Sequence, residues 1–151
     1  MSQPHMTVEE LDETFRAFVP HNKALGLTLR KMSASPAVAW LELPYDARFV
    51  GNPETGVLHG GVISTLIDAA SGMSVYLKLQ APIPIATLDL RVDFLKPATP
   101  GRAVTCRAEC FKTTHNVAFV RAIAFHDDEA DPLASSSSTF MLSTKGQVTP
   151  P

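Results

Sequence analysis

The sequence has little net charge and no long apolar run, and each of these absences excludes a class of protein. Its 13 Lys and Arg residues nearly balance its 15 Asp and Glu residues, giving a formal net charge of −2. This balance leaves no electrostatic footprint for nucleic acid or for an anionic membrane surface. The fully apolar runs are only a few residues long, so we expect no segment that crosses a membrane.

A secretory leader is also not expected, because the first ten residues contain acidic side chains and no basic stretch followed by an apolar core. Hydrophobic residues make up 45% of the 151-residue chain, which is typical of a globular protein with one domain. We therefore expect a cytoplasmic protein with a single domain over residues 7–143. Residues 1–6 and 144–151 are expected to be disordered.

Cysteine is almost absent, which excludes a disulfide scaffold. Cys106 and Cys110 are the only two, four residues apart in a segment that alternates like a strand. In a strand their Cα atoms would lie about 13 Å apart, whereas a disulfide needs less than about 7 Å. Without a nearby pair of histidines they also make a poor zinc site. We interpret both as apolar filling of the core and expect no metal.

Apolar spacing predicts two helices. Thr7 can cap a short N-terminal helix, in which Glu10 completes a capping box and which Pro20 ends. The segment 60–79 is apolar on nearly every side, so a helix there must be buried all round. At 1.5 Å per residue, such a helix is about 30 Å long.

Alternation of apolar and polar residues predicts six strands, at 25–32, 37–43, 85–96, 102–112, 117–126 and 133–142. The last four are expected in meander order, and residues 46–56 are expected to form a loop. In the strand 85–96, Leu88 and Leu90 fall on one face and Thr87 and Asp89 on the other. An antiparallel sheet wrapped around one long central helix, an α+β fold, accounts for this pattern. Because one sheet covers only part of that helix, we expect a partner surface to cover the rest.

Asp68 is the strongest candidate for chemistry. It is the only charged residue between Glu54 and Lys78, and it lies in the middle of the apolar helix. An ionised carboxylate buried without partners costs several kcal/mol, so its position favours a catalytic role. The structural alternative is that Asp68 faces a solvated groove or pairs with a core arginine.

The same helix begins at His59-Gly60-Gly61. The first N–H groups of a helix have no partners within it, and two glycines allow a ligand to approach closely. Together with the helix dipole, these donors suit an oxyanion. The alternatives are a tight chain turn without a ligand and a packed, hydrogen-bonded His59.

Spacing separates these two features within one chain. Asp68 lies eight residues after Gly60, about 12 Å along the helix axis. A reacting carbonyl would have to lie within about 3 Å of both groups, so a shared reaction requires two chains. A two-fold axis that sets the helices antiparallel would bring Gly60 of one chain to Asp68 of the other. The spacing therefore predicts a dimer.

These residues resemble those of a known family. The matching segments are Asn52, Gly56, His59-Gly60-Gly61, Leu66, Asp68, Thr87-Leu88-Asp89-Leu90 and Phe94-Leu95-Lys96-Pro97. They resemble the hotdog-fold acyl-CoA thioesterases of the phenylacetate-pathway (PaaI-like) type over about residues 20–143. The resemblance implies a hotdog fold and a homodimer whose sheets join, or a homotetramer of two such dimers. It also implies hydrolysis of an aryl- or medium-chain acyl-CoA substrate.

The resemblance implies a role for each catalytic residue. Asp68 of one chain acts as general base or nucleophile, and the Gly60 N–H of the other chain polarises the carbonyl. Asn52 lies close to that carbonyl, His59 is counted among the catalytic residues, and Thr87 helps to place the attacking water. Because the segment from Asn52 to His59 is one residue longer than in the family, the exact role of Asn52 is open. These groups need no metal or organic cofactor.

The resemblance also leads us to expect that Gly61 and Ser64 contact the substrate. Two other functions remain open from the sequence. One is a non-catalytic acyl-CoA-binding or sensing hotdog protein, although the short N-terminal helix is no DNA-recognition element. The other is a hydratase on the same fold, which would need an Asp/His pair near the substrate.

Overall fold

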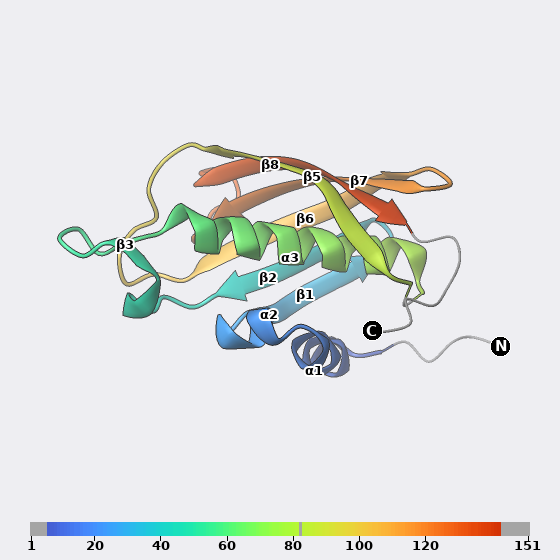
Figure 1. Cartoon of the computed structure of the whole chain (residues 1–151), viewed down its shortest axis with the longest axis horizontal. Coiled ribbons are helices and arrows are strands. Elements are labelled where there is room, and N and C mark those ends of the chain that lie inside the picture. Colours follow the sequence, from blue (N-terminus) through green and yellow to red (C-terminus); the bar gives the residue numbers. More distant parts are fainter. Residues whose placement is uncertain (1–5, 82, 143–151) are drawn as a thin grey trace, which may run out of the picture.

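The computed structural model describes residues 6–81 and 83–142 of the chain. The disorder expected at residues 1–6 and 144–151 falls, apart from Met6, outside the described residues. Figure 1 shows one antiparallel sheet curved around a long helix, α3 (Gly60–Leu79). This arrangement confirms the hotdog architecture expected from the sequence. The helix also has the bounds that the apolar segment 60–79 predicts.

The sheet has six strands in the order β1-β2-β6-β7-β8-β5. Their bounds are β1 (Thr28–Ala34), β2 (Ala37–Leu43), β5 (Ile85–Phe94), β6 (Val104–Thr113), β7 (Val117–Phe125) and β8 (Ala134–Leu142). The meander order expected for the last four strands is wrong in one respect: β5 pairs with β8 rather than with β6, while β6 adds to β2. Alternation identifies residues that form strands, but it does not say which strands become neighbours.

The core lies between α3 and the concave face of the sheet. As expected, the residues of β6 that face the helix are buried: Val104, Cys106, Ala108 and Cys110. Both cysteines are free, and burial raises the pKa of both thiols. Many other side chains on this face are alanines, which let the helix lie close to the strands. These fully or nearly fully buried residues include Ala39, Ala118, Ala122 and Ala124.

By length and composition alone, α3 could cross a membrane, in contrast to what the short apolar runs suggest. Half of its most apolar window is buried inside the fold, however, and the helix forms the core of the domain. Its apolar character is therefore explained by packing against the sheet.

The N-terminal helix α1 (Val8–Phe18) begins at the predicted capping box of Thr7 and Glu10. It covers the edge strand β1, and Asp12 Oδ1 accepts a hydrogen bond from the Leu29 N–H at 2.7 Å. Pro20 ends α1 as predicted, but it also begins a second short helix, α2 (Pro20–Ala24), which the sequence did not indicate. Proline is suited to the first position of a helix, because its missing N–H would have no partner there.

The segment expected to be a loop contains a 3₁₀ turn, η1 (Ala47–Phe49), and a small hairpin of β3 (Val50–Asn52) and β4 (Val57–Leu58). These elements are too short to produce a recognisable alternation. The hairpin leads directly into α3, so it determines how the helix begins.

Asp12 provides a test of how α1 is attached to the sheet. Asp12→Ala and Asp12→Asn both remove the ion pair with Arg16, but only Asn keeps an oxygen acceptor for the buried Leu29 N–H. We expect Asp12→Ala to lower the free energy of unfolding by about 1–3 kcal/mol and Asp12→Asn to lower it by markedly less. Urea denaturation measures both, and equal losses in the two variants would contradict the assignment.

Candidate active site

Asp68 faces strand β5 from the middle of α3. Its side chain is half-buried, and its Oδ1 accepts a hydrogen bond from the Thr87 hydroxyl at 2.8 Å. Within residues 6–81 and 83–142, Asp68 takes part in no ion pair with a Lys, Arg or His side chain. The alternative of a core arginine is thus not found in the described part of the chain. No hydrogen bond to its other oxygen, Oδ2, is found among the described residues.

Thr87 reaches Asp68 because β5 contains a β-bulge. Thr87 lies opposite Phe140 and Asp89 lies opposite Thr139, so Leu88 is an extra residue without a partner on β8. The bulge reverses the alternation along the strand. The expected placement of Thr87 on the face opposite Leu90 is therefore wrong: Thr87 contacts the helix, and Leu90 packs against the same core.

His59 is the N-cap of α3. Its ring Nδ1 accepts a hydrogen bond from the Gly61 N–H at 2.9 Å, and its carbonyl accepts one from the Val62 N–H at 3.1 Å. Within a single chain, His59 therefore matches the alternative of a packed, hydrogen-bonded histidine. The Gly60 N–H has no hydrogen-bond partner among the described residues. Of these three donors at the helix start, it is the one left for a ligand.

Close contacts with His59 favour glycine at two positions, Gly51 and Gly61. A Cβ on Gly61 would lie 2.9 Å from His59 Nδ1, and a Cβ on Gly51 would lie 3.1 Å from the His59 Cα. The β3–β4 hairpin thus rests on His59, and the Gly61 N–H is already used by the cap. A contact between Gly61 and the substrate stays a prediction.

Asn52 lies at the end of β3, in the hairpin that precedes His59. Its side-chain oxygen accepts a hydrogen bond from the Glu54 N–H at 3.0 Å, and its carbonyl accepts one from the Gly56 N–H at 2.9 Å. The oxygen therefore stabilises the turn of the hairpin, while no hydrogen bond of the Asn52 amide nitrogen is found among the described residues. Its role at the carbonyl also stays a prediction.

One stripe of α3 faces β5 at a spacing of four residues. Gly60 lies under Phe94, whose Cζ is 3.2 Å from the position of a Cβ on Gly60. Asp68 contacts Thr87, and Ile85 Cδ1 lies 3.6 Å from the position of a Cβ on Gly72. The helix and the strand therefore run antiparallel, and half-buried Ser64 lies on the same stripe, midway between Gly60 and Asp68.

A single chain does not bring Gly60 and Asp68 together. They contact opposite halves of β5, in agreement with their separation of about 12 Å along the axis. A site that uses both groups therefore has to include a second chain.

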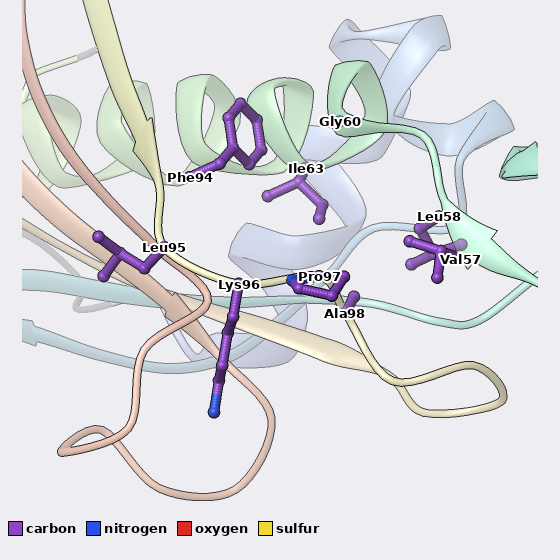
Figure 2. A pocket seen from close by; sticks show the side chains of 9 residues that line it. All are labelled: Val57, Leu58, Gly60, Ile63, Phe94, Leu95, Lys96, Pro97 and Ala98. Carbon is purple, nitrogen blue, oxygen red and sulfur yellow. The ribbon is translucent and has the colours of Figure 1, made fainter. Parts of the chain in front are cut away.

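Two pockets flank the start of α3. The first, of about 320 Å³, lies between the first turn of the helix, β4 and residues 94–98, and Gly60 forms part of its wall (Figure 2). The second, of about 390 Å³, lies on the other flank and is lined in part by His21, Arg48, His59 and Thr65.

The sequence alone predicts no role for Phe94 at this site, because alternation does not show which end of a strand meets the start of a helix.

The sequence matches the thioesterase superfamily over residues 55–132. It is 31% identical to the medium/long-chain acyl-CoA thioesterase YigI of Salmonella typhimurium, over 86% of this chain and 90% of YigI. A crystal structure of a protein from Pseudomonas aeruginosa has a TM-score of 0.79 and 38% identity, over 89% of this chain and 98% of that one. The phenylacetic acid degradation protein PaaI of Thermus thermophilus, solved as a mutant, has a TM-score of 0.69 and 24% identity, over 82% of this chain and 98% of its own.

This chain belongs to the thioesterase superfamily, and it has the hotdog fold of its structural neighbours. The family and its relatives named thioesterases identify the chain as a thioester hydrolase. This confirms the class of enzyme expected from the sequence.

The capping role of His59 can be tested by substitution. We expect His59→Ala to lower the free energy of unfolding by about 0.5–2 kcal/mol, because the Gly61 N–H loses its acceptor. His59→Asn supplies another N-cap acceptor and should restore most of that stability. Thermal and urea unfolding measure the difference. Equal stability of the wild type and His59→Ala would contradict the capping role.

Proposed function

We propose that this protein is a cytoplasmic acyl-CoA thioesterase that works as a homodimer, or as two such dimers, with each active site shared between two chains. The activity named for YigI supports the substrate class. The observation that carries the proposal is the antiparallel arrangement of α3 and β5. It puts the free Gly60 N–H at one end of the strand and the Asp68 carboxylate at the other.

The outer edge of β5 supports the dimer. This strand of ten residues ends the sheet, and an edge strand of this length with unpaired backbone groups is prone to pair with another chain. Leu88, on this strand, is 51% exposed. Antiparallel pairing of β5 with its own copy would produce one continuous sheet and an isologous interface.

The register of such a pairing decides whether the site is completed. If the two-fold axis passes through Arg91, Leu90 lies opposite Val92 and, with Leu88 again the extra residue of the bulge, Thr87 of one chain lies opposite Phe94 of the other. Neighbouring strands lie about 4.8 Å apart. Asp68, which contacts Thr87, would then lie near Gly60 of the second chain, which lies under Phe94. The helices would also run antiparallel and cover each other's remaining apolar surface.

The chemistry follows from these two groups. As a general base, Asp68 takes a proton from a water molecule, and the water oxygen bonds to the thioester carbon. The carbonyl oxygen becomes an oxyanion that accepts a hydrogen bond from the Gly60 N–H of the other chain, at the positive end of α3. The C–S bond then breaks, and the departing thiolate receives the proton from Asp68. As a nucleophile, Asp68 would instead attack the thioester carbon and displace the CoA thiolate as the C–S bond breaks, and water would hydrolyse the resulting anhydride, giving back the Asp68 carboxylate and a proton for the thiolate.

In this reaction, Thr87 positions the Asp68 carboxylate and the attacking water. Its hydroxyl donates to Asp68 Oδ1, which fixes the orientation of the carboxylate. The Thr87 oxygen can in turn accept a hydrogen bond from the attacking water. Ser64, midway between Gly60 and Asp68 on the same stripe, is placed to contact the bound thioester.

Asp68→Asn tests the catalytic carboxylate. The variant keeps the size of the side chain and an acceptor for Thr87 but cannot take a proton or attack. We expect kcat for acyl-CoA hydrolysis to fall by about 10²–10⁴-fold, measured by release of free thiol. Stability should hold or rise, because a partly buried charge is removed. Unchanged kcat with a large loss of stability would instead support a purely structural role.

Gly60→Pro tests the oxyanion donor, because it removes the N–H at a helix position where proline is tolerated. Gly60→Ala is the matched control, since it adds a Cβ close to Phe94 but keeps the N–H. We expect the Pro variant to lose at least about 10²-fold in kcat relative to the Ala variant. Equal kcat in the two variants would contradict the role of the Gly60 N–H.

The same two variants, Asp68→Asn and Gly60→Pro, test the shared site. Inactive chains of the two kinds, mixed and reassociated, should regain part of the activity, because one site of each heterodimer has both groups intact. Mixtures that stay inactive, with heterodimers demonstrated by native mass spectrometry, would refute a site formed by two chains.

A further inference from the structure

We propose that the pocket beside Gly60 receives the acyl group of the substrate, and that Phe94 determines how large an acyl group fits. The inference rests on the proposed acyl-CoA thioesterase activity and extends it to substrate selection. It starts from the contact between the Phe94 ring and Gly60, the residue whose N–H is free.

The pocket offers a ligand almost only apolar surface. Apart from Gly60 and Lys96, its walls come from apolar side chains, among them Val57, Leu58, Ile63, Leu95 and Pro97. Figure 2 shows the Lys96 side chain extending away from Gly60, and its ammonium group pairs with Asp131. No uncompensated charge therefore faces the pocket from Lys96. An apolar group gains free energy on entering it, in proportion to the area removed from water.

The second pocket has more hydrogen-bonding side chains than the first, and this difference bears on the orientation of the substrate. It lies on the opposite flank of the first turn of α3 and is also lined by apolar side chains, Leu25, Phe49, Val50 and Val62, but it adds the hydrogen-bonding side chains of His21, His59 and Thr65 and of Arg48, which pairs with Asp46. An acyl-CoA has an apolar acyl arm and a polar arm with amides and phosphates, joined at the thioester. With the carbonyl on the Gly60 N–H, the acyl arm fits the first pocket, and the polar arm finds its hydrogen-bonding partners on the other flank, where His21, His59 and Thr65 lie.

The backbone that holds Phe94 is fixed by pairing with neighbouring segments. Its backbone pairs with Ala134 on β8, and the next residue, Leu95, donates its N–H to the Leu133 carbonyl at 2.8 Å. The strand therefore fixes the point from which the side chain extends, and the size of that side chain limits how much of Gly60 it can cover. The ring is 52% exposed, so the pocket can be enlarged by truncation without opening a hole in the core.

The pocket is small, and this gives the ring its influence. A volume of about 320 Å³ lies at the lower end of the usual range for ligand pockets, about 300–1,000 Å³. Removing most of the Phe94 ring should therefore admit acyl groups that the wild type excludes. Each additional methylene that becomes buried contributes about fourfold or more to kcat/KM.

The experiment compares kcat/KM across a series of straight-chain acyl-CoA substrates from acetyl to palmitoyl, together with phenylacetyl-CoA. The variants are Phe94→Ala and Phe94→Trp, with Phe94→Leu as a milder truncation should Phe94→Ala fold poorly. Phe111→Ala is the matched control, because Phe111 is also a half-exposed phenylalanine, at 49%, and does not line the pocket. Light scattering verifies that each variant keeps the oligomeric state of the wild type.

We expect truncation of Phe94 to raise kcat/KM for longer or bulkier acyl groups at least about tenfold, measured against kcat/KM for the acyl group that the wild type prefers. Phe94→Trp should shift the preference to shorter groups, and Phe111→Ala should leave the profile unchanged. An unchanged profile in folded, active Phe94 variants would overturn the role of Phe94 and leave the thioesterase proposal standing. A wild type that hydrolyses none of the substrates would refute the proposed function, and the inference with it.

Discussion

Helix α3 has apolar or small side chains on every side, and no face of it can be left in water without cost. The sheet buries the face that includes Ile63, Leu66 and Met73, and alanines on the strands allow close contact. The side toward β5 remains partly open and contains Asp68. A second chain that covers this side would bury the remaining apolar surface and enclose the carboxylate. The same requirement thus explains the fold and the proposed dimer.

The positions of the two proposed catalytic groups, the Gly60 N–H and the Asp68 carboxylate, follow from the direction of α3 relative to β5. A helix start supplies N–H donors, and His59 satisfies the donor of Gly61 while leaving that of Gly60 free. Two turns later, Asp68 lies where the strand presents Thr87. Because α3 and β5 run antiparallel, the two-fold axis of the proposed dimer would exchange the two ends of β5. Donor and base would then meet although each chain holds them apart.

Much of this could be predicted from residues alone. The bounds of α3, the capping box of α1 and the inward face of β6 follow from periodicity, which depends on neighbours three, four or two residues apart. The pairing of β5 with β8 could not be predicted, because it depends on contacts between distant segments. The β3–β4 hairpin and α2 are too short to show a period, and the cap on Gly61 depends on a side-chain rotamer. The roles of Asn52, Gly61 and Ser64 depend on a bound substrate.

The bulge at Leu88 shows why strict alternation had to fail at this site. Leu90 and Val92 must face the helix to pack against the core, and Phe94 must face it to cover Gly60. The Thr87 hydroxyl must face it too, to reach Asp68. In a regular strand, residues separated by an odd number of positions lie on opposite faces, so Thr87 and Leu90 could not both do so. One extra residue between them resolves the conflict, and Leu88 is the residue left without a partner on β8. The local irregularity is therefore what allows one strand to serve both the core and the proposed base.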